Sequence, residues 1–178
     1  MMDFFQLFWI QIILVLIPMY VANSSAMIFG GGKTQLDFGI KWRDGQPLFG
    51  KGKTWRGVLS GIACGTLAGA IVGFAFPGYA ALVSPSYGLL SLLLSMGAIT
   101  GDAVAGFFKR RNKLPPGEPV LFLDQLDFVI GGMVFGIPLF VANFPSFYQL
   151  IALALITLLV HRSANFLAFK LHLKRVPW

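Results

Sequence analysis

Three long stretches without Asp, Glu, Lys or Arg dominate this chain of 178 residues: 4–32, 57–101 and 128–160. A helix needs about 20 mostly apolar residues to cross a bilayer. The second and third stretches are long enough for more than one helix, and turn residues divide them near Pro77-Gly78 and Pro145-Ser146. The pattern predicts five transmembrane helices, at 4–22, 58–76, 87–108, 123–142 and 146–168.

The polar residues between these runs predict where the helices end. Asn23, Ser24 and Ser25 are expected to end the first helix. The segment that follows is rich in glycine and basic residues, and its Asp44-Gly45 pair is compatible with a short β-hairpin at 36–49. Glycines recur every four residues at 61, 65, 69 and 73. Small residues at this spacing allow helices to pack closely in membranes, so we expect this glycine face to be structural.

The composition agrees with a membrane protein. The chain is 56% hydrophobic and 12% charged, with a mean hydropathy of +0.75, whereas soluble domains carry about 25% charged residues. The expected fold is therefore an all-α integral membrane protein, with residues 1–178 forming one domain by length. The single cysteine, Cys64, excludes a disulfide framework and a thiolate metal site.

The distribution of basic residues predicts the topology. All 14 Lys and Arg residues fall in segments 23–56 and 109–122 and in the tail from 161. With five helices, these three segments lie on one side of the membrane, which the positive-inside rule makes the cytoplasm. The N-terminus is then outside and the C-terminus cytoplasmic. The net charge of +7 is explained by topology and phosphate binding, so we expect no nucleic-acid partner.

Acidic residues gather in segment 101–127, which holds four of the seven in the chain: Asp102, Glu118, Asp124 and Asp127. Ionisable groups near a bilayer are costly unless they are paired or functional. Asp124 and Asp127 are three residues apart and share one face of a helix, while Asp102 ends the preceding helix on the same side. Carboxylates of this kind hold one or two Mg²⁺ ions, and the neighbouring basic residues suit a nucleoside triphosphate. For Asp102, an ion pair with Lys109 is the alternative.

Several motifs resemble a known enzyme family. Lys109-Arg110, Pro116-Gly117 and Asp124-x-x-Asp127 are similar to the signature of CTP-dependent phosphatidate cytidylyltransferases, although Gly106 and Gln125 depart from that pattern. The chain more closely resembles the archaeal branch, the CDP-archaeol synthases. The shared motifs are Ala22-Asn23, FGGG at 29–32, Asp37-Phe38, GKTWRG at 52–57, Gly101-Asp102, KRR at 109–111, LDQLDF at 123–128, Ala164-Asn165 and VPW at 176–178.

This resemblance implies a reaction in which CTP and 2,3-bis-O-(geranylgeranyl)-sn-glycerol 1-phosphate give a CDP-lipid and pyrophosphate, with Mg²⁺ as cofactor. It implies that Asp124 and Asp127 are catalytic metal ligands, and that Asp102 is a third ligand or supports the other two. Asn23 would orient a phosphate or the cytosine. The residues expected to bind the triphosphate or the lipid phosphate are Lys51, Lys53, Arg56, Lys109 and Arg110. The enzyme would lie in the cell membrane with its active site facing the cytoplasm.

Three other functions compete with this one. A small transporter or channel would need polar residues across the whole bilayer, whereas here the charges lie on one side. A structural or assembly subunit would leave the acidic cluster unexplained. A nucleotidyltransferase acting on another lipid phosphate, such as phosphatidate, is separated from the preferred function only by the family resemblance. His161 is expected to be a structural residue at the membrane interface.

Overall fold

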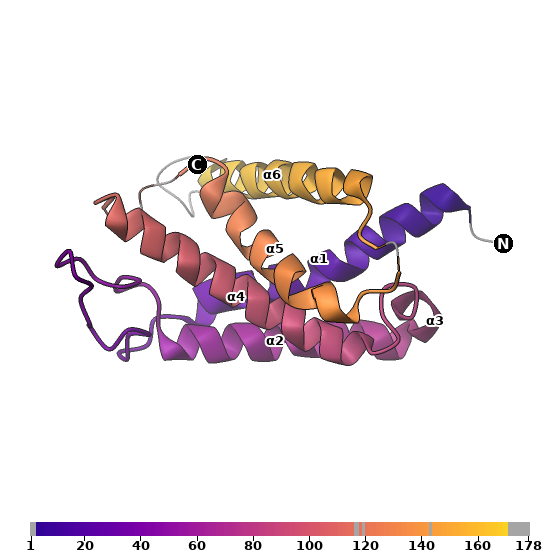
Figure 1. The fold of residues 1–178 in the computed structure, drawn as a ribbon, viewed down its shortest axis with the longest axis horizontal. Coiled ribbons are helices and arrows are strands. Elements are labelled where there is room, and N and C mark those ends of the chain that lie inside the picture. Colours follow the sequence, from indigo (N-terminus) through magenta and orange to yellow (C-terminus); the bar gives the residue numbers. More distant parts are fainter. Residues whose placement is uncertain (1–2, 116–117, 119, 143, 171–178) are drawn as a thin grey trace.

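The computed structural model describes residues 3–115, 118, 120–142 and 144–170, and these form a bundle of helices (Figure 1). No β-strand occurs among these residues. This agrees with the predicted all-α class. The helices are α1 (Phe4–Phe29), α2 (Trp55–Ala75), α3 (Pro77–Ala80), α4 (Tyr87–Arg111), α5 (Leu123–Gly136), the 3₁₀-helix η1 (Ile137–Leu139) and α6 (Phe147–Lys170).

The lengths of the helices support a membrane protein. Of the described helices, α1, α2 and α4 are long and apolar enough to cross a membrane, and α6 contains a shorter apolar stretch, Phe147–Ser163. α5 has 14 residues and is about 21 Å long, which is less than the ~30 Å hydrocarbon thickness. The prediction that this helix continues to residue 142 is wrong. It gives way at Gly136 to η1, where Pro138 has no N–H to donate to the helix.

The predicted end of the first helix is also wrong. α1 continues past Asn23 to Phe29, so the polar residues that suggested a terminus lie on the helix itself. Gly30 follows the helix, at a position where a Cβ atom would collide with the carbonyl oxygen of Ala26. The longer helix carries Asn23 and Ser24 toward the charged end of the bundle.

Glycines bring the helices together at two crossings. Gly65 and Gly69 of α2 lie against Ser95 and Ser91 of α4, and a Cβ on either glycine would overlap these side chains. The expected packing role of this glycine face is therefore confirmed. The second crossing joins α4 to α5, where Gly101 lies directly against the backbone of Asp127. That crossing places two of the predicted site carboxylates on neighbouring segments.

Segment 30–54 connects α1 to α2. In place of the two strands of a hairpin, it has isolated bridges, Gln35 with Thr54 and Lys41 with Pro47. The Asp44-Gly45 turn does form, because the N–H of Gly45 donates to the carbonyl of Trp42 at 2.9 Å and Gly45 has a φ of 77°. This segment lies at the same end of the bundle as the end of α4, the start of α5 and the end of α6 (Figure 1).

Candidate active site

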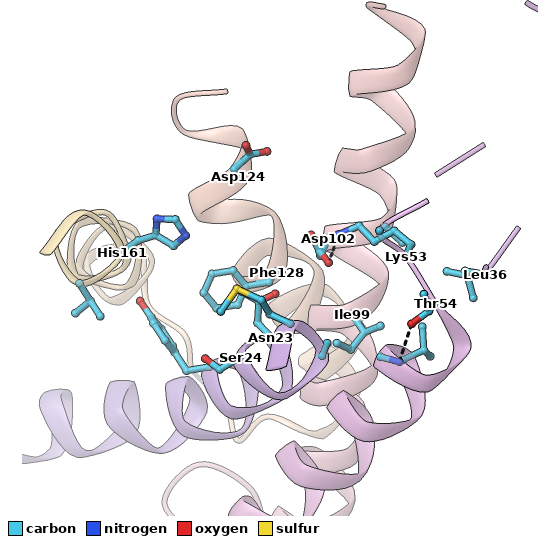
Figure 2. A pocket seen from close by; sticks show the side chains of 18 residues that line it. Asn23, Ser24, Leu36, Lys53, Thr54, Ile99, Asp102, Asp124, Phe128 and His161 are labelled. Carbon is cyan, nitrogen blue, oxygen red and sulfur yellow. Dashed lines mark hydrogen bonds and ion pairs between the residues drawn. The ribbon is translucent and has the colours of Figure 1, made fainter. Parts of the chain in front are cut away.

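A cavity of ≈ 510 Å³ lies at this end of the bundle. Figure 2 shows that its side chains come from α1, α4, α5 and α6, from the start of α2 and from segment 30–54, which precedes α2. Its polar lining residues include Asn23, Ser24, Lys53, Asp102, Asp124 and His161, and its apolar lining residues include Val58, Ile99, Phe128 and Val160. Charged groups and an apolar wall therefore face the same space.

Asp102 of α4 forms an ion pair with Lys53, which lies two residues before the first residue of α2 (Figure 2). The position of Lys53 is fixed by the start of that helix, because Oγ1 of Thr54 caps α2 by accepting from the N–H of Gly57 at 3.1 Å. The alternative pairing of Asp102 with Lys109 does not occur. Asp102 is instead joined to a residue 49 positions away in the sequence.

Asp124 pairs with Lys109 across the gap between α4 and α5. The ammonium of Lys109 donates to both carboxylate oxygens, at 2.7 and 3.0 Å. One of these oxygens also accepts from the N–H of Val120 at 3.0 Å. Asp124 lies in the first turn of α5, where the helix dipole favours a negative charge. Several contacts therefore hold this carboxylate at the mouth of the site.

Asp127 lies one turn further along α5. Its Oδ1 accepts from the N–H of Phe128 at 2.6 Å, and its carboxylate is within electrostatic range of Asp102, Asp124 and Lys53. It is not among the residues that line the cavity. The close contact at Gly101 places the backbone of Asp127 against α4, beside Asp102.

The chemistry of these donors fits Mg²⁺. Within the described part of the chain, no three acidic, His or Cys side chains are close enough together to form a complete set of ligands. Mg²⁺ is usually held by only one or two carboxylates, with water and substrate phosphates completing its coordination. Asp102, Asp124 and Asp127 can supply the carboxylates, and the paired lysines can turn to incoming phosphates.

The other predicted binding residues have different surroundings. Asn23 lines the cavity, whereas Lys51 is exposed on the loop outside the lining. Arg56 lies beside Lys33 in a separate surface hollow. Arg110 is buried, and its guanidinium donates to the carbonyl of Pro115 at 3.3 Å. The structure thus brings Asn23 and Lys53 to the carboxylates but does not bring Lys51, Arg56 or Arg110 into the cavity lining.

Comparisons with known proteins identify the family of this chain. The model of the family described as CarS-like, CDP-archaeol synthase, matches residues 4–178. This chain belongs to the CDP-archaeol synthase family. The CDP-archaeol synthase of Pyrococcus abyssi is 42% identical over 174 residues, which are 98% of each chain. That of Methanocaldococcus jannaschii is 45% identical over 169 residues, 92% of this chain and 93% of the relative.

A solved structure has a similar fold. It is described as an intramembrane enzyme for archaeal membrane lipid biosynthesis, and it matches with a TM-score of 0.75 and 34% identity over 86% of this chain and 91% of its own. This likeness and the apolar helices support an integral membrane protein. Of the CDP-archaeol synthase motifs, residues 176–178 and the side chains of 164–165 lie outside the part that the structure describes, as does Pro116-Gly117 of the phosphatidate cytidylyltransferase signature.

In this CDP-archaeol synthase family member, Asp37 organises the loop that carries Lys53. Its carboxylate accepts from the N–H groups of Gly39, Phe49 and Gly50 at 3.0, 3.1 and 3.4 Å. Burial of the carboxyl opposes its ionisation, but these hydrogen bonds outweigh burial and lower the pKa of Asp37 below its ordinary value of 3.8. The sequence contained Asp37 in a family motif, yet its role became visible only once the loop was folded.

Arg111 ties the same loop to the end of α4. Its guanidinium donates to the carbonyl of Pro47 at 2.6 Å and pairs with Asp44 at 2.6 Å. It also lies over the ring of Phe107, 4.5 Å from the centroid. The basic residues at the end of α4 therefore have different roles. Lys109 pairs with Asp124 at the site, and Arg111 holds the loop.

The Asp37→Asn variant is expected to loosen segment 30–54. An amide has one acceptor oxygen instead of two, so at least one buried N–H loses its partner, at a cost of about 1–3 kcal/mol. Tryptic cleavage at Lys41 and Arg43, both exposed, should become about tenfold faster or more, as this cost predicts. Because the pKa of Asp37 is lowered, the wild-type carboxylate keeps this contribution at neutral pH and loses it only as the pH falls through that lowered pKa.

Asp44→Asn is the matched control for this experiment. Arg111 keeps its hydrogen bond to the carbonyl of Pro47 in this variant. The side chain of Asp44 is 36% exposed and ion pairs of exposed groups contribute little, so cleavage should change by less than about threefold. Equal cleavage rates in the two variants would show that Asp37 does not organise the loop.

Proposed function

We propose that this chain transfers CMP from CTP to 2,3-bis-O-(geranylgeranyl)-sn-glycerol 1-phosphate, giving CDP-unsaturated archaeol and pyrophosphate. The observation that carries the proposal is the match to CDP-archaeol synthases over nearly the whole chain. The cavity supports it, because the Lys53–Asp102 pair, Asp124 and an apolar wall face one space at one end of a membrane-embedded bundle. A lipid phosphate and a nucleotide together need both kinds of surface.

The chemistry requires positioning more than acid–base catalysis. An oxygen of the lipid phosphate attacks the α-phosphorus of CTP and forms the new P–O bond. The bond from that phosphorus to the bridging oxygen breaks, and pyrophosphate leaves with the electron pair. A phosphate monoester has a second pKa of about 6, so the nucleophile is already largely deprotonated at neutral pH. The absence of a general base among the residues expected to act is therefore consistent with this reaction.

The residues of the cavity have separate roles in this proposal. Lys53 and Lys109 exchange their carboxylate partners for the phosphates of CTP and the lipid, which neutralises charge as it develops. Asp124 and Asp127 would hold Mg²⁺, with Asp102 supporting the other two, and the ion would polarise the α-phosphate and stabilise the leaving pyrophosphate. Asn23 would orient a phosphate or the cytosine. Among the predicted basic residues, we give priority to Lys53, which lines the cavity, and to Lys109, which pairs with the lining residue Asp124, over Lys51, Arg56 and Arg110.

We also propose that the charged end faces the cytoplasm. The basic residues of segment 30–54 and of the end of α4 gather at one end of the bundle (Figure 1), as the positive-inside rule requires of a cytoplasmic side. CTP is supplied from the cytoplasm, which agrees with an active site on that side. As part of this proposal, the chain crosses the membrane five times and its N-terminus lies outside.

The test is a nucleotide and lipid selectivity assay. Detergent-solubilised protein is incubated with Mg²⁺, each of the four ribonucleoside triphosphates in turn, and the isoprenoid lipid phosphate. We expect pyrophosphate release with CTP alone, dependence on both lipid and Mg²⁺, and a CDP-lipid detected by mass. Phosphatidate in place of the isoprenoid lipid tests for the alternative substrate. If folded protein released no pyrophosphate with any of the four nucleotides, the proposal would be contradicted.

A further inference from the structure

A second hollow, of ≈ 420 Å³, lies between α5 and α6, and every residue that lines it is apolar. Its floor is buried, since Leu153, Val129 and Met133 are 1%, 5% and 8% exposed. Its rim is open, since Ile130, Val134 and Ile137 are each more than half exposed. We call this hollow the α5–α6 groove. A buried floor with an open rim means that a long molecule can enter from the side.

The groove adjoins the polar cavity along the same two helices. Asp124 and Phe128 of α5 line the cavity, as do Val160 and His161 of α6. Leu126, which lines the groove, is on the opposite face of α5 from those two α5 residues, whereas Leu153 and Ala154 share one face of α6 with Val160 and His161. The charged cavity and the apolar groove therefore lie on either side of the first turns of α5, against one face of α6.

We infer that the α5–α6 groove binds one isoprenoid chain of the lipid phosphate, an inference that rests on the function proposed above. The order of surfaces across the start of α5 matches such a molecule, with charged groups for the phosphate on one side of the helix and an apolar channel for a hydrocarbon chain on the other. From Leu126 to Ile137 the channel runs about 16 Å along α5 to the first residue of η1, which suits a long chain and not a headgroup. The open rim admits the chain directly from the bilayer.

Filling the groove should change how the enzyme selects chain length. Ala154 is half-buried in the groove, and Ala154→Phe places a ring in the channel. In mixed micelles, this variant should raise the KM for the C20 lipid phosphate about tenfold, equivalent to 1.4 kcal/mol of binding free energy. The KM for a lipid phosphate with C5 chains and the KM for CTP should remain unchanged. Ala70→Phe, at an exposed position on α2, is the matched control and should behave like wild type.

An equal effect on long and short lipids, or no effect on either, would overturn the inference. Failure of the proposed function looks different, because wild-type protein would then release no pyrophosphate with CTP. Photo-crosslinking of wild-type protein answers the question without a variant. A C20 lipid phosphate with a diazirine in one chain should label α5 and α6 at groove residues such as Met133 and Leu153, and unlabelled lipid phosphate should compete.

Labelling elsewhere in the chain would overturn the inference. Equal displacement of the label by an ordinary bilayer phospholipid would do the same, because it would show that the groove holds bulk lipid. Loss of labelling only on detergent-induced monomerisation would identify a second copy of the chain as the occupant.

Discussion

The Asp127→Asn variant is expected to lose CMP transfer by about 10²–10³-fold, the loss typical of removing one preorganised electrostatic group from an active site. Asp127 lies against Gly101 and beside Asp102. Asparagine keeps the shape but removes the negative charge that a divalent ion would require. The measurement is kcat from pyrophosphate release at saturating CTP and lipid, with the Mg²⁺ dependence recorded in parallel.

Asp3→Asn is the control for the same chemical change. Asp3 caps α1 by accepting from the N–H of Gln6, at the end of the bundle away from the cavity (Figure 1). Asparagine caps helices about as well as aspartate, so activity and stability should match wild type. If folded Asp127→Asn kept wild-type kcat and Mg²⁺ dependence, Asp127 would not be a metal ligand.

Gly101→Ala is expected to reduce both stability and activity. A Cβ at this position would collide with the backbone carbonyl of Asp127, and a backbone atom cannot move aside as a flexible side chain can. Overpacking of this kind costs about 1–3 kcal/mol. Because the same contact sets the distance between α4 and α5, misplacement of the carboxylates should lower kcat by about 10²-fold.

Gly88→Ala separates this effect from the general effect of alanine in a helix. Gly88 is also in α4, but a Cβ there has nothing within 4 Å. Alanine favours helix over glycine by up to about 1 kcal/mol, so this variant should be as stable as wild type or more so. Thermal unfolding in detergent measures the two changes in stability, which should be a loss for Gly101→Ala and no loss for Gly88→Ala. The proposed role of the crossing would be wrong if both variants were equally stable and active.

The helices that the sequence predicted best are those flanked by charge or by clear turn residues. α4 begins at Tyr87 as predicted and extends three residues beyond the expected end. α1 was predicted too short because Asn23 and its polar neighbours resemble a helix terminus, although in the fold they face a polar cavity. α5 was predicted too long because the apolar run continues past Pro138, and hydrophobicity alone does not show where a helix breaks.

The candidate site was predicted in its acidic half more completely than in its basic half. Carboxylates are so rare in this chain that Asp102, Asp124 and Asp127 were identified by their scarcity alone. The partner of Asp102 depended on the path of segment 30–54, which periodicity does not determine. Lys53 and Arg56 are three residues apart but lie on either side of the start of α2, so one enters the cavity and the other faces a separate hollow.

The open rim of the α5–α6 groove has a consequence for substrate supply. Moving hydrocarbon from a membrane into water costs about 0.8 kcal/mol per CH₂ group, so withdrawing a single C20 chain would cost on the order of 16 kcal/mol. A site reached from the side removes that barrier, because the lipid never leaves the hydrocarbon layer. The relevant substrate concentration is then the mole fraction of lipid phosphate in the membrane, and the enzyme encounters it by two-dimensional diffusion.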